Sequence, residues 1–222
     1  MDGNLKTKRM MITSIPEKDI LKLVQHQLDN MFMLSGEERI ELEEVFPEVL
    51  DKLKYCFDKT VNKYYQKQLG GVKYAYFNPF HSCQYTIFLY FFSKVVSVNS
   101  QNTLLADKLY YLNKMLNGCD LFYQIDLPSF WGCEHPCGSI MGRAQYGEGF
   151  YFYQCCTVGG NHGLYPVIGN SVCMYAHSQI IGNCHIGDNV KVGAGCLIKD
   201  QDVTANSLVF GQSPHLIIKS AK

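Results

Sequence analysis

The chain has 222 residues, of which 47% are hydrophobic and 18% are charged, so it can bury a sizeable core in one or two domains. Its 20 basic and 20 acidic residues cancel, which removes the net positive charge that holds nucleic acid or an anionic membrane surface. We therefore expect a globular protein without a nucleic-acid partner.

The N-terminal residues 1–19 include basic side chains but no apolar segment, so a secretory signal is not expected. The longest apolar run, Tyr85 to Phe92, is far shorter than the roughly 20 residues that span a bilayer, and it predicts a buried helix. The ten cysteines lack the spacing of a zinc site or a disulfide framework. These features predict a cytoplasmic protein with free thiols, no bound metal and no membrane span.

The first half of the chain has a helical pattern. From Pro16 to about Gly70, apolar residues recur at three- and four-residue intervals between charges, and Pro47 is expected to start or break a helix. Residues 81–96 and 104–116 predict two further helices, of which the first is aromatic nearly all round and should pack between neighbours. The pattern predicts an α-helical domain over residues 1–122.

The second half has a period of six. Inward-facing candidates recur at this spacing from Ile168 onward, and compact residues follow each of them after four positions. A weaker version of the same repeat, with aromatic residues in place of aliphatic ones, continues towards the N-terminus, so the repeat should cover most of residues 126–212. The series are Ile168, Met174, Ile180, Ile186, Val192 and Ile198, then Val172, Ser178, Cys184, Val190 and Cys196, and the backward extension Ile140, Tyr146, Phe152 and Val158.

A six-residue period fits neither a helix nor a half-buried strand, whose periods are 3.6 and 2. It fits a coil in which each hexapeptide forms one side of a triangular prism, so that the apolar residues stack along its axis. Glycines such as Gly169, Gly187 and Gly193 would then lie at the corners, where the chain bends or packs closely. An antiparallel β-sandwich is the alternative, but its turns are usually spaced more widely.

The repeat resembles the left-handed parallel β-helix of hexapeptide-repeat acyltransferases, and the order of motifs resembles serine O-acetyltransferase. This resemblance implies an α+β protein with an α-helical domain at 1–122 and a left-handed β-helix at 123–222. The motifs that carry it are VCMYAHSQIIGNCHIGDNVKVGAGCLIKDQDV (172–203), QID (124–126), EHPCGSIMG (134–142), YQCCTVGG (153–160), PVIG (166–169), FGQSP (210–214) and, more weakly, FHSCQY (80–85).

The resemblance further implies an O-acetyltransferase that uses acetyl-CoA and a small-molecule acceptor. It implies a homotrimer, or a dimer of trimers, with active sites between neighbouring prisms. His135 matches the general base of the family, and Asp126 matches the carboxylate that orients it. Only nine positions separate Asp126 from His135, however, so one side of the prism is missing between them.

Two other positions depart from the family pattern. Glu134 replaces an aspartate that contacts the acceptor, which keeps the charge and extends its reach. Before Pro166 the family has an Arg-His pair, and the arginine holds the carboxylate of the acceptor amino acid. This chain has Leu164 and Tyr165 there instead. His162 or the hydroxyl of Tyr165 is a candidate replacement for the lost histidine.

Contacts to acetyl-CoA are mostly made by backbone atoms in this family, so small residues matter there because they let a ligand approach the chain. By position, the resemblance places six residues along the cofactor groove: Ala176, Ser178, Ala194, Gly195, Lys199 and Pro214.

Three functions are consistent with the sequence. An O-acetyltransferase is the main interpretation, and the missing arginine favours a sugar of a polysaccharide precursor over serine as the acceptor. Serine O-acetylation in cysteine biosynthesis is the first alternative. A non-catalytic β-helix scaffold is the second. An amine acceptor or a longer acyl chain would change only the shape of the groove.

Overall fold

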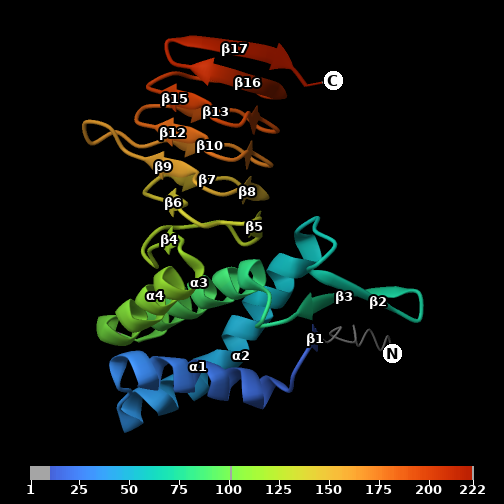
Figure 1. The fold of residues 1–222 in the computed structure, drawn as a ribbon, viewed down its shortest axis with the longest axis vertical. Helices are drawn as coiled ribbons and strands as arrows, with labels where there is room; N and C mark the ends of the chain where they lie inside the picture. Colours follow the sequence, from blue (N-terminus) through green and yellow to red (C-terminus); the bar gives the residue numbers. More distant parts are fainter. Residues whose placement is uncertain (1–10, 101, 222) are drawn as a thin grey trace, which may run out of the picture.

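The computed structural model describes residues 11–100 and 102–221. Four helices form one end of the molecule, and a column of stacked strands rises from them to the C-terminus (Figure 1). Among the described residues, no helix has the length and apolar character needed to cross a membrane. No secretory signal is expected in residues 1–19, and residues 1–10 of this segment lie outside the described part of the chain.

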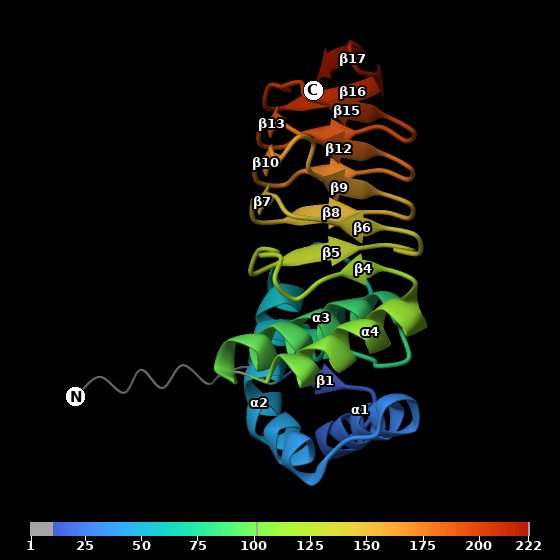
Figure 2. The same ribbon diagram turned by 90° about the vertical axis from the view of Figure 1, so that its left-hand side faces the viewer.

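The helical end is organised around α3 (Ser82–Asn99), which packs against α2 (Gly36–Lys59) and α4 (Thr103–Asn117). The residues of α3 from Cys83 to Ser93 are all buried, which confirms the helix predicted from its apolar run. The remaining helix, α1 (Glu17–Phe32), lies below α3 and α4 (Figure 2).

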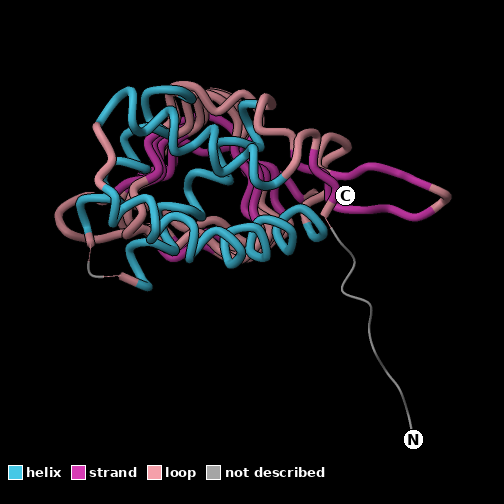
Figure 3. Tube along the Cα trace, turned by 90° about the horizontal axis from the view of Figure 1, so that it is seen from below, coloured by secondary structure: helices cyan, strands magenta, loops and turns pink. Residues whose placement is uncertain are grey.

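One expectation for this half is wrong. Pro47 neither starts nor ends a helix but lies inside α2, whose apolar face buries Phe46 and Val49 and keeps the helix continuous despite the missing N–H. The helical region is confirmed, and it contains some strands as well. A small sheet is present, and its hairpin projects sideways from the body (Figure 3); its strands are β1 (Ile12–Thr13), β2 (Gln66–Leu69) and β3 (Val72–Phe77).

The column is the predicted left-handed parallel β-helix, with about five turns. Its strands stack in register on three faces, and β17 (His215–Ser220) folds back antiparallel on β16 at the top. Face 1 holds β4 (Asp120–Leu121), β6 (Ile140–Met141), β9 (Thr157–Gly159), β12 (Gln179–Ile181) and β15 (Leu197–Lys199). Face 2 holds β5 (Trp131–Cys133), β8 (Phe150–Phe152), β11 (Cys173–Met174), β14 (Lys191–Val192) and the start of β16 (Ser207–Gln212). Face 3 holds β7 (Gln145–Tyr146), β10 (Val167–Ile168) and β13 (His185–Ile186).

The six-residue period is confirmed by burial. Every residue of the main series from Ile168 to Ile198 is at most 3% exposed, and the compact residues between them are also buried. The backward extension fails at Ile140, which is 48% exposed, because Met141 pairs with the inward Val158 and takes the interior position. The spacing from Met141 to Tyr146 is therefore five residues, not six.

The first coil lacks a strand on face 3. Residues 122–130 join β4 to β5 directly, which matches the side of the prism that the sequence lacks before His135. The first strand of the column, Asp120–Leu121, already pairs with β6, so the β-helix begins just before the expected boundary at residue 122.

Candidate active site

The corner that joins face 2 to face 1 is longer in the first coil than in the coils above it. The chain turns there in four residues between β8 and β9, between β11 and β12, and between β14 and β15, but it uses six between β5 and β6. We call residues 134–139 the His135 corner. Cys137 returns to the regular ladder, since its carbonyl accepts the N–H of Cys155 at 2.9 Å. His135, two residues earlier, lies in the extra length, and its side chain is exposed.

The backbone of His135 has a φ of 51°, in the left-handed region that few residues adopt. On the same edge, two and three coils above this corner, the Ala176 carbonyl accepts the N–H of Gly195 at 3.0 Å. Ala194 precedes Gly195 on the same edge. The structure therefore brings three predicted cofactor residues onto the edge that carries the predicted base, two or three coils above it.

The His135 corner also touches the N-terminal end of α3. The thiol of Cys83, the second residue of that helix, contacts the backbone of His135 and the thiol of Cys133. Hydrogen bonding to Cys133 lowers the pKa of Cys83 to about 6, with help from His135 and nearby His81, although burial opposes this. The first turn of α3 thus fixes the backbone beneath the predicted base.

Glu134 faces a groove lined by tyrosines. Its carboxylate is a hydrogen-bond partner of the Tyr153 hydroxyl, and burial together with this carboxylate raises the pKa of Tyr153 to about 12. The Tyr153 ring stacks on Tyr175 with centroids 5.3 Å apart, and Tyr151 lies 5.8 Å away on the other side. We call this space, of about 430 Å³, the tyrosine groove; it is lined by Val61, Asn62, Lys63, Tyr64, Glu134, Tyr151 and Tyr153.

Asp126 has a different partner from the one that the resemblance implies. Its carboxylate lies 2.6 Å from the ammonium of Lys94 and is 85% exposed. Strand β5 runs between Asp126 and His135. Along α3, Lys94 follows Cys83, the neighbour of His135, by three helical turns, or roughly 16 Å. The structure does not bring Asp126 and His135 together.

His162 and Tyr165 lie on the opposite edge of face 1, in the loop that follows β9 and projects from the column (Figure 1). The side chain of Asn161 holds this loop to the second coil above it, with its amide 2.6 Å from the carboxylate of Asp200. Tyr165 packs over Gly160 and is 45% exposed.

Two further cofactor candidates, Lys199 and Pro214, share this second edge. They line one cavity of about 430 Å³ beside Asp200 and Gln201. Ser178 differs from all the others, because its side chain is fully buried inside the coil with its hydroxyl 3.6 Å from the thiol of Cys156. Its backbone is also used within the coil, because its N–H donates to the carbonyl of Tyr175 and its carbonyl accepts the N–H of Thr157, so Ser178 presents no exposed surface to a ligand.

Comparisons with known proteins agree with this architecture. The family model described as bacterial transferase hexapeptide (six repeats) matches residues 165–200. A serine acetyltransferase of Synechococcus elongatus is 29% identical over 117 residues, which are 50% of this chain and 48% of that protein. One of Staphylococcus epidermidis is 30% identical over 133 residues, covering 51% of this chain and 61% of the relative. The chain thus spans about half the length of the curated relatives it matches.

Solved structures extend the similarity through the helices. The serine acetyltransferase of Neisseria gonorrhoeae superposes with a TM-score of 0.69 at 19% identity, over 94% of this chain and 81% of that one. A serine acetyltransferase in complex with CoA gives 0.67 at 17% identity, over 91% and 84%. In fold, and in sequence over about half of its length, the chain is similar to serine acetyltransferases. At these identities the solved structures show a shared fold. The similarity in sequence comes from the hexapeptide family model and the curated relatives.

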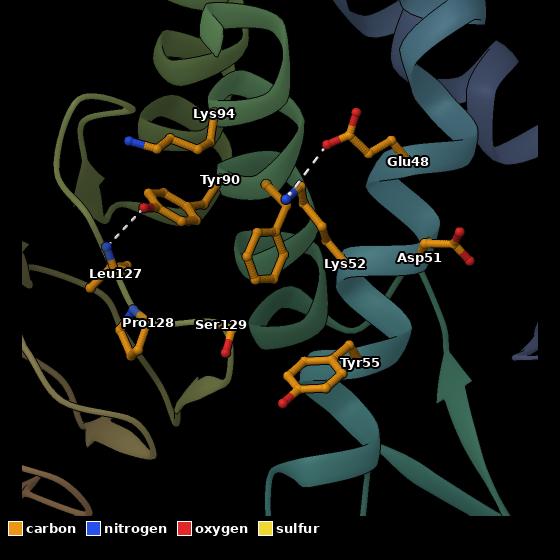
Figure 4. Close-up of a pocket in the computed structure, with 10 residues that line it drawn as sticks. Glu48, Asp51, Lys52, Tyr55, Tyr90, Lys94, Leu127, Pro128 and Ser129 are labelled. Carbon is orange, nitrogen blue, oxygen red and sulfur yellow. Dashed lines mark hydrogen bonds and ion pairs between the residues drawn. The ribbon is translucent and has the colours of Figure 1, made fainter. Parts of the chain in front are cut away.

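Another cavity lies away from the His135 corner. It measures about 530 Å³ and is enclosed by α2, α3 and the segment before β5 (Figure 4). Lys52 reaches Glu48 at 3.5 Å, and the hydroxyl of Tyr90 accepts the N–H of Leu127 at 3.0 Å. The first contact lies within α2, and the second joins α3 to the first coil. Within residues 11–100 and 102–221, no cluster of three or more His, Cys, Asp or Glu residues is placed to hold a metal ion.

Sequence reasoning missed the helical side of the tyrosine groove. Lys63 and Asn62 follow α2, about 70 positions before Glu134, and no repeat or motif links them to it. The aromatic residues offered a usable signal, because Tyr153 and Tyr175 follow the inward Phe152 and Met174 and must therefore point outward from adjacent coils.

Proposed function

We propose that the chain is an acetyl-CoA-dependent O-acetyltransferase with a small-molecule acceptor, and that serine is this acceptor. The observation that carries the proposal is the common edge of His135, Ala176, Ala194 and Gly195. It places a candidate base at the foot of a strip of small residues. The names of the curated relatives favour serine over the sugar that the missing arginine suggested.

The residues of this edge fit an extended cosubstrate. An added Cβ at Gly195 would meet no atom within 4 Å, so the backbone there is open to a ligand. A related structure is described as a complex with CoA. Acetyl-CoA supplies a thioester whose carbonyl carbon is open to attack by an alcohol, and Ala176, Ala194 and Gly195 would hold it by backbone contacts.

His135 would accept the proton of the acceptor hydroxyl through a ring nitrogen as that oxygen forms the new ester bond. The carbon–sulfur bond breaks, and the proton leaves with the CoA thiol. Glu134 would hold the acceptor from the tyrosine groove. The imidazole suits this role because its exposure on a protruding corner leaves it free to reach a ligand.

The second edge of face 1 would serve a neighbouring copy. His162, Tyr165, Lys199 and Pro214 are separated from His135 by the width of face 1, whose strands span roughly 10 Å. A second copy that presents its own second edge to the His135 corner would complete the site. We therefore propose a trimer in which each site is built by two chains.

The test is thiol release from acetyl-CoA with serine and, separately, with a panel of sugars. His135→Asn keeps a side chain that tolerates the positive φ, and should lower kcat by about 10²- to 10⁴-fold. His26→Ala changes an exposed histidine of α1 and should leave the rate unchanged. Turnover of a sugar without turnover of serine would reject the proposed acceptor. Equal activity of His135→Asn and wild type would favour a role as a scaffold.

A further inference from the structure

The turn after α2 is fastened to strand β5. The hydroxyl of Thr60 donates to the carbonyl of Trp131 at 3.1 Å, and the hydroxyl of Tyr65 donates to the carbonyl of Cys133 at 3.0 Å. Within residues 11–100 and 102–221, β5 pairs with β8 above it and with no strand below it, so side chains from the helical half can donate hydrogen bonds to the carbonyls on its lower side. The turn is thereby fixed beside the residue that precedes Glu134.

Asn62 sets the conformation of this turn. Its carbonyl oxygen accepts the N–H of Tyr64 at 2.9 Å, which is the hydrogen bond of an Asx turn, and its amide donates to the Tyr151 hydroxyl at 2.9 Å. Lys63 lies between Asn62 and Tyr64. Its backbone is therefore held on both sides at the wall of the tyrosine groove.

The ammonium of Lys63 is available to a ligand. It lies 4.9 Å from the centre of the Tyr64 ring, and within the described residues it forms no ion pair. Tyr64 is itself fixed by its carbonyl, which accepts the amide of Gln84 at 2.6 Å, and by its ring, 5.3 Å from His81. A cation on a rigid turn thus faces the groove without a carboxylate partner.

The opposite wall of the groove carries the negative charge. Glu134 is half-buried and is oriented by the hydroxyl of Tyr153. A ligand that lies between Glu134 and Lys63 meets one carboxylate and one ammonium, and His135 directly follows Glu134 in the chain. This arrangement suits a small zwitterion that also carries a hydroxyl group.

We propose that Lys63 binds the carboxylate of the acceptor and so selects a hydroxy amino acid. This inference rests on the proposed function and replaces the missing arginine with a cation from the helical half of the same chain. The loop before Pro166 supplies no such charge, since Leu164 and Tyr165 stand there on the far edge of face 1.

The experiment compares serine with ethanolamine, which keeps the amine and hydroxyl but lacks the carboxylate. Lys63→Met should raise KM for serine about ten- to a hundredfold, the effect of losing a charge-assisted hydrogen bond, with kcat nearly unchanged. Turnover of ethanolamine should not change. Lys63→Arg should restore most of the affinity for serine. Lys67→Met is the matched control, because Lys67 also lies over a tyrosine ring, at 5.1 Å, but outside the groove.

An equal loss with both acceptors, or no loss with serine, would overturn the role of Lys63. Calorimetric binding of serine to wild type and Lys63→Met separates this inference from the proposed function. Serine that binds to wild type and binds less tightly to Lys63→Met supports the inference even if no acetyl transfer is seen, a result that would reject only the reaction. Failure of wild type to bind serine overturns the inference.

Discussion

The ammonium of Lys94 and the carboxylate of Asp126 lie 2.6 Å apart where the helices meet the first coil. This pair occupies the far end of β5 from His135. The missing strand on face 3 explains the separation, because residues 122–130 take a direct route along α3 instead of completing a coil. The carboxylate that should orient the base is thus used to join the two halves of the molecule.

We expect Asp126→Asn to keep kcat within a few-fold of wild type. The exposed pair should contribute no more than about 1 kcal/mol to stability, because water screens it. Steady-state rates beside those of His135→Asn check this prediction. If Asp126→Asn loses as much activity as His135→Asn, the two residues form the catalytic pair that the resemblance implies.

Lys108 supports a buried carboxylate. Its ammonium lies 2.7 and 2.9 Å from the two oxygens of Glu38, which also caps α2 through the N–H of Ser35. Burial raises the pKa of Glu38, but these hydrogen bonds outweigh it and hold the pKa below its ordinary value of 4.5. Lys108→Met should reduce the free energy of unfolding by about 3–5 kcal/mol at neutral pH, since it leaves a buried carboxylate without its cationic partner.

The stability lost in Lys108→Met should depend on pH, because the pKa of Glu38 is lowered in the folded chain. A carboxyl with a lowered pKa stabilises the fold above its unfolded pKa, and this stabilisation disappears as the pH falls through the folded value. The difference between wild type and Lys108→Met should therefore shrink below about pH 4.5 in urea titrations. Lys22→Met, which removes an exposed 3.8 Å pair with Asp19, should cost less than about 1 kcal/mol at every pH. A comparable loss in both variants would contradict this account.

Cys83 should make stability depend on pH in the neutral range. Its pKa is lowered to about 6 in the folded chain from an ordinary value of 9.0, so the thiolate stabilises the fold above pH 9 and this stabilisation is lost as the pH falls to 6. The difference in unfolding free energy between wild type and Cys83→Ser should rise from pH 6 to pH 9. Denaturant titrations across this range measure it.

Cys196→Ser provides the comparison for that series. Burial raises the pKa of Cys196 to about 11, so its thiol stays protonated and the variant should show a constant difference from wild type between pH 6 and pH 8. A flat profile for Cys83→Ser as well would show that Cys83 is also a neutral thiol.

Gly187 tests the packing between coils. A Cβ added there would lie 2.4 Å from the backbone nitrogen of Ala205 in the next coil, so the two coils would have to separate. Gly187→Ala should therefore lower stability by at least about 1–3 kcal/mol. Gly36→Ala, in α2, meets nothing within 4 Å and should be neutral or slightly stabilising. Thermal unfolding of the two variants side by side decides the matter; similar midpoints would refute the prediction.

The six-residue period was sufficient to predict the column, because each buried position depends only on the coil above and below it. It failed at Ile140, where a five-residue spacing shifts the inward position to Met141. A period carries no information about where a single residue is gained or lost at a corner.

The contacts between the two halves were beyond sequence reasoning for a different reason. Lys63 approaches Glu134, and Lys94 approaches Asp126, only because α2 and α3 dock beneath β5. Such docking depends on the shape of whole surfaces and leaves no spacing pattern. Pro47 illustrates the same limit within one helix, since packing of its neighbours overrides its local tendency to end the helix.

The regular stacking above the His135 corner has a consequence for the size of the molecules that can use it. Each coil adds a fixed rise of roughly 4.8 Å, set by main-chain hydrogen bonds. The edge at Gly195 is therefore about 14 Å above the level of His135, whatever side chains lie between. The backbone thus fixes the distance between His135 and Gly195. An insertion or deletion of one complete coil would change this distance by one whole rise, while substitutions along the edge would leave it unchanged.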